Sequence, residues 1–304
     1  MSEINEISYE ISFEVSDSDH KCGPELKFKN GHCAPLDLII EFAKAWNDNN
    51  CENKIKLSER LDTVNPGKYK ICLVKQLQDK MSPQCGNSQK CWLKQPFINR
   101  INEKYKFFLE ARLYRPRGPN SGFKWLNTFD IMKVMEQYEY KYKDYKFMGA
   151  VPIDFDKLSL LIPDTDIYLA NLDFNKLEAI EKTRLGIIFN LDTHDKPGSH
   201  WVGMFIDLKK GHALFFDSYG SRPPKEVREL MLRLDRYFQS KNIKDRQISY
   251  NKLRHQYKNS ECGVYSIAFI LRMLAGSSFN DINQIKVTDD EINQCRNIYF
   301  SKDK

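Results

Sequence analysis

The feature that most constrains this fold is the alternation of short apolar strands and amphipathic helices after residue 184. The expected strands cover 185–191, 201–207, 213–218 and 246–251. One expected helix is opened by Pro223-Pro224, and a mostly apolar one runs from Cys262 to Leu274 and is ended by Gly276. This order predicts an α+β fold with a mixed, central β-sheet flanked by helices.

Lys209-Lys210-Gly211 marks a hairpin turn between the second and third strands. If the turn is centred on Lys209-Lys210, positions 202 and 217 lie opposite each other, with position 200 one diagonal step away on the same face. His200 and Asp217 then come within reach of an imidazole–carboxylate hydrogen bond. A different turn length would shift the pairing, so the sequence supports this geometry without fixing it.

A dense cluster of structure-breaking residues at 115–122 divides the 304 residues, a length that suits one large domain or two ordinary ones. We expect an N-terminal arm or accessory region at 1–115 and the main domain at 116–304. Asn127 or Thr128 begins a helix in the main domain. In the arm, strict alternation predicts a strand at 7–15, and helical spacing predicts a helix at 34–47. Residues 48–100 show little periodicity.

Composition excludes some classes of protein. The chain has no run of the roughly 18–20 apolar residues that a membrane span needs, and its first twenty residues are acidic, unlike a signal peptide. A net charge of +6 permits weak contact with nucleic acid without arguing for it.

The eight cysteines are expected to be reduced thiols. A zinc site at His20, Cys22, His32 and Cys33 is disfavoured because no tight cysteine pair anchors it, so no metal or other cofactor is expected.

Cys262 is the candidate nucleophile. A cysteine at a helix N-terminus lies among unpaired backbone N–H groups at the positive end of the helix dipole, which favours the thiolate. His200 is the candidate base and Asp217 its orienting acid, while the Gln256 side chain can donate to an oxyanion. The competing interpretation is a buried structural cysteine. His194, His212 and His255 lie in turns or loops without a same-face acid.

These residues carry a family resemblance. The motifs His200-Trp201, Phe216-Asp217-Ser218 and Gln256 with Cys262-Gly263 six residues later resemble the SUMO-protease and adenain superfamily of cysteine proteases. Trp125-Leu126-Asn127 is similar to the segment that lines the entry for the substrate tail in that family. Residues 259–265, 289–300 and 149–152 resemble the core-polyprotein maturation proteases of large cytoplasmic DNA viruses. Glu261 departs from the aspartate that is usual in the cellular enzymes.

The resemblance implies a cysteine endopeptidase that cleaves viral core or capsid polyproteins at Gly-Gly-Xaa-type sites during virion maturation. It implies catalytic His200, Asp217, Cys262 and Gln256, with Trp125 and Asn127 at the entry for the substrate. Trp201, next to His200, can bind the substrate by covering a narrow channel that admits only residues without a Cβ atom; the competing interpretation is a core tryptophan in a strand. The resemblance also implies polyprotein partners, no membrane, and action in the host cytoplasm and the virion core. The sequence does not determine the oligomeric state. Two alternatives remain: an isopeptidase that removes a ubiquitin-like protein, and an acetyltransferase with a similar Cys-His-acid set.

Overall fold

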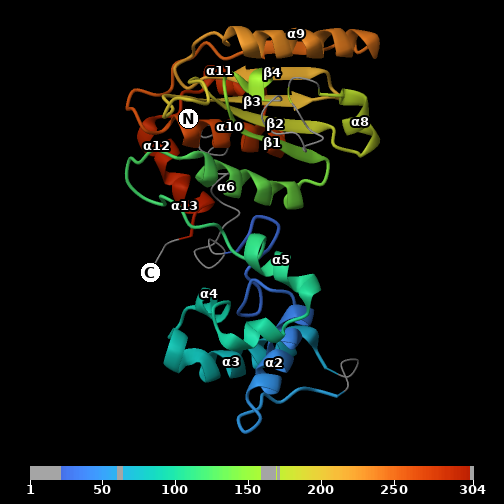
Figure 1. The fold of residues 1–304 in the computed structure, drawn as a ribbon, viewed down its shortest axis with the longest axis vertical. Helices are drawn as coiled ribbons and strands as arrows, with labels where there is room; N and C mark the ends of the chain where they lie inside the picture. The colour runs from blue at the N-terminus through green and yellow to red at the C-terminus, as the bar shows by residue number, and fades with distance from the viewer. Residues whose placement is uncertain (1–21, 60–63, 159–168, 170–171, 302–304) are drawn as a thin grey trace. The chain divides into compact units, whose positions relative to one another are not determined.

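The computed structural model describes residues 22–59, 64–158, 169 and 172–301. These residues form two compact units, with the boundary between Pro116 and Arg117 (Figure 1). The strand expected at 7–15 lies outside the described residues. Among the residues that are described, no helix is both long and apolar enough to cross a membrane.

The N-terminal unit is helical. Its elements are α2 (Leu36–Asn49), α3 (Pro66–Cys85), α4 (Gln89–Trp92), the 3₁₀ helix η3 (Pro96–Arg100) and α5 (Glu103–Ala111). The helix expected at 34–47 is confirmed as α2, which buries Leu38, Ile39 and Phe42. The core of this unit contains stacked rings. The buried His32 ring stacks on Trp92, with ring centroids 5.2 Å apart.

Residues 48–100, which show little periodicity in the sequence, nevertheless contain α3, which spans 20 of these residues. The Asn65 side chain accepts a hydrogen bond from the Lys68 N–H, and Pro66 occupies the first helical turn, so this Asn-Pro-Gly segment, whose sequence is also typical of a turn, begins a helix. A largely polar surface concealed the short buried stripe of Leu73, Leu77 and Met81.

The expectation that all eight cysteines are reduced is also wrong. Cys22 is bonded to Cys33, and Cys85 to Cys91. The fold brings the Cα atoms of these pairs to 5.4 and 5.5 Å, within the range that a disulfide spans. The expectation rested on the cellular compartment, which does not reveal that two cysteines lie close together. Only the folded chain brings these pairs to bonding distance. The first disulfide also removes both sulfur ligands from the disfavoured zinc site.

The C-terminal unit contains the sheet and the helices around it. Its strands are β1 (Tyr145–Pro152), β2 (Arg184–Asn190), β3 (Trp201–Asp207), β4 (His212–Phe216) and β5 (Gln247–Tyr250). Its helices are α6 (Thr128–Lys141), α7 (Phe155–Leu158), α8 (Phe174–Ala179), α9 (Lys225–Ser240), α10 (Cys262–Ala275), α11 (Phe279–Gln284), α12 (Asp289–Gln294) and α13 (Arg296–Tyr299). The α+β class with a mixed sheet is therefore confirmed.

The five strands lie in the order in which they occur along the chain. β1 and β2 are parallel, as are β4 and β5, whereas β3 is antiparallel to both of its neighbours. Gly203 pairs with Phe216 and Asp207 with His212, which is the register expected for a hairpin centred on Lys209-Lys210. This register places the start of β3 beside the end of β4.

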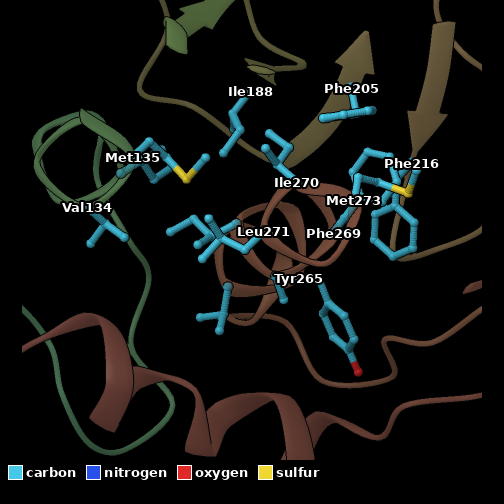
Figure 2. Packing of buried hydrophobic residues seen from close by; sticks show 14 of the residues in the cluster. Val134, Met135, Ile188, Phe205, Phe216, Tyr265, Phe269, Ile270, Leu271 and Met273 are labelled. Atoms are coloured by element: carbon cyan, nitrogen blue, oxygen red, sulfur yellow. The ribbon is translucent and has the colours of Figure 1, made fainter. Parts of the chain in front are cut away.

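Helices cover both faces of the sheet. α9 packs on one face of the strands, and α10 and α6 pack on the other; Figure 1 shows α9 beyond β4 and α6 beyond β1. Figure 2 shows Ile270 and Leu271 of α10 among side chains from α6 and the strands, including Met135, Ile188 and Phe205. Every residue of α10 from Cys262 to Leu274 is buried. The helix that begins at Cys262 is thus fixed along its whole length, which restricts the position of its first residue.

Candidate active site

Cys262 is the first residue of α10, at the buried end of the helix that packs on the sheet. Polar residues precede it, and Gly276 ends the helix in the left-handed conformation, with φ of 98°. Gly263 allows a close approach of Leu126, since a Cβ atom at position 263 would lie 3.1 Å from the Leu126 Cβ. The nucleophile's turn is therefore packed directly against the segment that precedes α6.

Glu261, the residue before Cys262, forms an ion pair with Arg296 of α13 at 2.9 Å, and both side chains are 0% exposed. Arg296 also donates to the backbone carbonyls of Pro119 and Lys124, so one guanidinium joins two segments around the nucleophile. Burying a charged pair is costly unless further hydrogen bonds satisfy it, as they do here. Glu261, which stands where the cellular enzymes usually have aspartate, therefore has a buried partner in Arg296 that the sequence did not reveal.

His200 and Asp217 meet where β3 begins and β4 ends. The His200 Nε2 lies 2.7 Å from Asp217 Oδ1, and both side chains are buried. A carboxylate only accepts, so Nε2 carries the proton, and Nδ1 is the ring nitrogen available to Cys262. Burial lowers the pKa of His200, but the hydrogen bond to Asp217 and the interaction with Cys262 outweigh it and raise this pKa to about 9. Cys262, His200 and Asp217 thus form one connected set.

The Asp217 carboxylate is itself held in place. The side chain of Asn251 accepts from the Asp217 N–H at 2.8 Å and donates to the Asp217 carbonyl at 2.7 Å. The Tyr219 N–H donates to Asp217 Oδ1 at 2.9 Å. Burial raises the pKa of Asp217, yet the hydrogen bond from His200 brings it below its ordinary value. The carboxylate therefore remains charged and oriented toward the imidazole.

Tyr219 stacks on the His200 ring, with centroids 4.5 Å apart and an interplanar angle of 10°. Sequence reasoning missed both Tyr219 and Asn251. Tyr219 directly follows the Phe216-Asp217-Ser218 motif, and this position is the only feature of the sequence that could have identified it. No feature of the sequence identifies Asn251.

Gln256 is buried, and its side-chain amide is fixed at both ends. The Ser218 hydroxyl donates to Gln256 Oε1 at 2.6 Å, and Gln256 Nε2 donates to the Lys258 carbonyl at 2.7 Å. Because a carbonyl only accepts, the amide cannot be reversed without losing this bond. One N–H of the Gln256 amide is thereby used, and the second remains as a donor.

The predicted substrate-binding residues Trp125, Asn127 and Trp201 line one cleft of about 500 Å³. The buried Trp201 indole donates to the Leu126 carbonyl at 2.9 Å, which joins β3 to the segment before α6. The Asn127 side chain is occupied by a capping box with Asp130 at the start of α6. Asn127 therefore shapes the cleft wall with its side chain already engaged, whereas Trp125 is about half exposed.

The other candidate histidines have different partners. His194 lines the cleft and bonds to Asp154 through Nδ1 at 2.7 Å. His255 is buried, and desolvation together with Arg272 lowers its pKa to about 4. His212 begins β4 at the hairpin. The histidine that interacts with Cys262 is His200.

Residues 175–304 match the model of the Ulp1 protease family, C-terminal catalytic domain. A protein of Acanthamoeba polyphaga mimivirus named as a putative thiol protease is 35% identical over 285 residues, covering 92% of each chain. The chain belongs to the Ulp1 protease family. It is a cysteine-type peptidase, as the resemblance in its motifs implied.

A second relative, named as a SUMO-1 cysteine protease of African swine fever virus, is 23% identical and covers 74% of this chain and 86% of its own. The crystal structure of an African swine fever virus protease superposes with a TM-score of 0.60 at 18% identity, covering 95% of this chain and 98% of that one. At this identity the likeness concerns the fold, which this member of the Ulp1 family shares.

Proposed function

We propose that this chain is an endopeptidase that cleaves viral core or capsid polyproteins at Gly-Gly-Xaa-type sites during virion maturation. One observation carries the proposal: the His200 imidazole is bonded to Asp217 and interacts with Cys262, the first residue of a helix, strongly enough to raise its pKa. A thiol, an imidazole and an orienting carboxylate in this order are the parts of a cysteine protease.

In the proposed mechanism, Cys262 gives its proton to His200 Nδ1 and attacks the carbonyl carbon of the scissile bond. The tetrahedral oxyanion accepts hydrogen bonds from the second Gln256 N–H and the Cys262 N–H. The imidazolium protonates the leaving amine, and an acyl-enzyme remains on the sulfur. His200 then takes a proton from water, which attacks the acyl carbon and releases the acid.

The cleft supports selectivity for glycine before the scissile bond. Trp201 follows the base directly in sequence and is held by its bond to the Leu126 carbonyl. A bulky side chain fixed next to the catalytic base and lining the cleft favours substrate residues that lack a Cβ atom. This is the physical reason that we assign the two residues before the cleaved bond as glycines.

The biological setting is part of the same proposal. The relatives described above come from a mimivirus and from African swine fever virus, which supports polyprotein substrates and action in the host cytoplasm and the virion core. Residues 1–115 form the proposed accessory arm, and residues 116–304 the catalytic domain.

The decisive experiment is incubation of the full chain with candidate core polyproteins, followed by mass spectrometry of the new termini. We expect cleavage at Gly-Gly-Xaa-type sites, after the second glycine, by the wild type and none by Cys262→Ala. Cys72→Ala, which alters an exposed free cysteine, is the matched control and should retain activity. Cleavage by Cys262→Ala would refute the assignment of the nucleophile.

A second candidate is an isopeptidase that acts on a ubiquitin-like protein, which is favoured by the name "SUMO-1 cysteine protease" of one relative. A panel of SUMO and ubiquitin fusions assayed beside the Gly-Gly-Xaa polyproteins separates the two. Faster cleavage of a fusion than of every polyprotein would favour the isopeptidase.

A further inference from the structure

Four side chains outside the proposed catalytic set form a row that leads from His200 to the protein surface. We call Tyr219, Arg254, Tyr257 and Lys286 the aromatic–cation row. Tyr219 stacks on His200, and the Arg254 Cζ lies 5.2 Å from the Tyr219 ring centroid and 4.7 Å from that of Tyr257. The Lys286 Nζ lies 4.1 Å from the Tyr257 centroid. Aromatic and cationic groups thus alternate without a break.

The row is open to solvent and positively charged. Tyr257 is 62% exposed and Tyr219 36% exposed, and both cations are exposed as well. Within the described parts of the chain, neither Arg254 nor Lys286 has a carboxylate at ion-pair distance. The nearby Lys258 differs, because it pairs with Asp290 at 2.7 Å. Two cations held on aromatic faces keep donors free for an anionic partner.

The row is also fixed in position. Arg254 Nε donates to the Gln256 carbonyl at 2.9 Å, and the Tyr257 N–H donates to the buried carboxylate of Asp289 at 2.8 Å. Groups that are already ordered lose less conformational freedom when a partner binds. Such a surface is suited to recognition.

We propose that the aromatic–cation row binds acidic side chains of the substrate segment that follows the scissile bond. This inference rests on the proposed function. The cleft holds Trp125 and Trp201, which we assign to the glycines before the bond, and none of the four row residues lines it. Both surfaces meet at His200, since Trp201 follows it in sequence and Tyr219 stacks on its ring. A polypeptide bound across the nucleophile can therefore place the residues before the scissile bond in the cleft and the residues after it on the row.

The test uses the full-length protein and three Gly-Gly-Xaa peptides that differ only after Xaa, with glutamate, glutamine or lysine at the next positions. Exposed ion pairs contribute little individually, so we expect KM to be about two- to five-fold lower for the glutamate peptide than for the glutamine peptide, with similar kcat. The lysine peptide should have the highest KM, and added salt should reduce all differences.

Lys286→Gln should remove most of the preference for glutamate without changing kcat. Lys225→Gln, which neutralises an exposed lysine on α9, is the matched control and should leave the preference intact. A fourth peptide carries the glutamates before Gly-Gly. A preference that appears only with this peptide would overturn the assignment to the following segment, as would equal KM values for the first three.

Binding provides a readout that does not depend on cleavage. Fluorescence anisotropy with Cys262→Ala should show tighter binding of the glutamate peptide and loss of that advantage in the Cys262→Ala, Lys286→Gln double variant. If the wild type cleaves no peptide, the proposed function fails, whereas anisotropy still decides the role of the row. Binding of a short single-stranded oligonucleotide that Lys286→Gln abolishes, together with equal peptide affinities, would instead identify a nucleic-acid surface and refute the proposal.

Discussion

The Nε2 atom of His200 lies 2.7 Å from Oδ1 of Asp217, so the other ring nitrogen is the one available to Cys262. The pairing depends on strand register, because His200 immediately precedes β3 and Asp217 immediately follows β4. Asn251 holds the backbone of Asp217 on both sides, and Tyr219 covers the His200 ring. The imidazole is therefore oriented by contacts from several segments.

The first prediction concerns pH. Because the pKa of His200 is raised to about 9, the imidazolium needed for an imidazolium–thiolate pair is lost as pH rises through about 9, and kcat/KM should fall there. Asp217→Asn removes a group that raises this pKa while burial still lowers it, so the alkaline limb should move to lower pH. A pH–rate profile of both proteins measures the shift, and identical alkaline limbs would contradict it.

The same pKa predicts a dependence of stability on pH. The folded-state value is raised above 6.5, so the contribution of His200 to the free energy of unfolding is complete below pH 6.5 and is lost as pH rises through about 9. Thermal unfolding of the wild type against His200→Gln between pH 6 and 10 should show a difference that shrinks toward high pH.

The second prediction concerns Ser218, a positioning residue for Gln256. Gln256→Ala should lower kcat by about 10²–10³-fold, the usual effect of losing one oxyanion donor. Ser218→Ala loses the bond that holds Gln256 Oε1 and should lower kcat by about tenfold. In the double variant, Ser218→Ala should add almost nothing to the effect of Gln256→Ala. Additive losses of kcat would show that Ser218 acts independently.

The third prediction concerns the buried pair of Arg296 and Glu261. Arg296→Met leaves the Glu261 carboxylate buried and unpaired, which should lower the free energy of unfolding by about 3–5 kcal/mol. Arg246→Gln breaks a pair with Asp235 whose side chains are 34% and 28% exposed, and should cost less than about 1 kcal/mol. Urea unfolding compares the two variants, and equal losses would refute the special role of the buried pair.

The fourth prediction concerns glycine selectivity at the cleft. Replacing the glycine before the scissile bond by alanine should lower kcat/KM by about 10- to 200-fold in the wild type, the range observed for one carbon in a fitted pocket. Trp201→Leu removes the ring beside His200 and should reduce this ratio. The ratio compares two peptides on one protein, so a general loss of activity cancels. An unchanged ratio would exclude Trp201 as its source.

The fifth prediction concerns the cysteines. Thiol titration of the unfolded, unreduced chain should detect four free cysteines, namely Cys51, Cys72, Cys262 and Cys295. The same titration after reduction should detect all eight. Eight thiols before reduction would contradict the two disulfides.

Some elements could be predicted because their signals are local. Asn127 caps α6 through the N–H of Asp130, and Gly276 ends α10, so the chain itself marks where these helices begin and end. β1 could not be predicted in this way, because its pairing with β2 is irregular between Phe147 and Ala150 and its apolar residues do not alternate regularly. α3 could not be predicted because its surface is mostly polar.

The sequence by itself determined the helix and strand pattern of the C-terminal unit and the kinds of reacting group, because periodicity, caps and motifs involve residues close along the chain. Only the tertiary structure decided which polar residues support these groups. Arg296 reaches the Pro119 carbonyl across 177 positions, and Asn251 reaches Asp217 across 34. Such contacts leave no local pattern, since they arise only when the sheet and helices pack and bring distant donors and acceptors together.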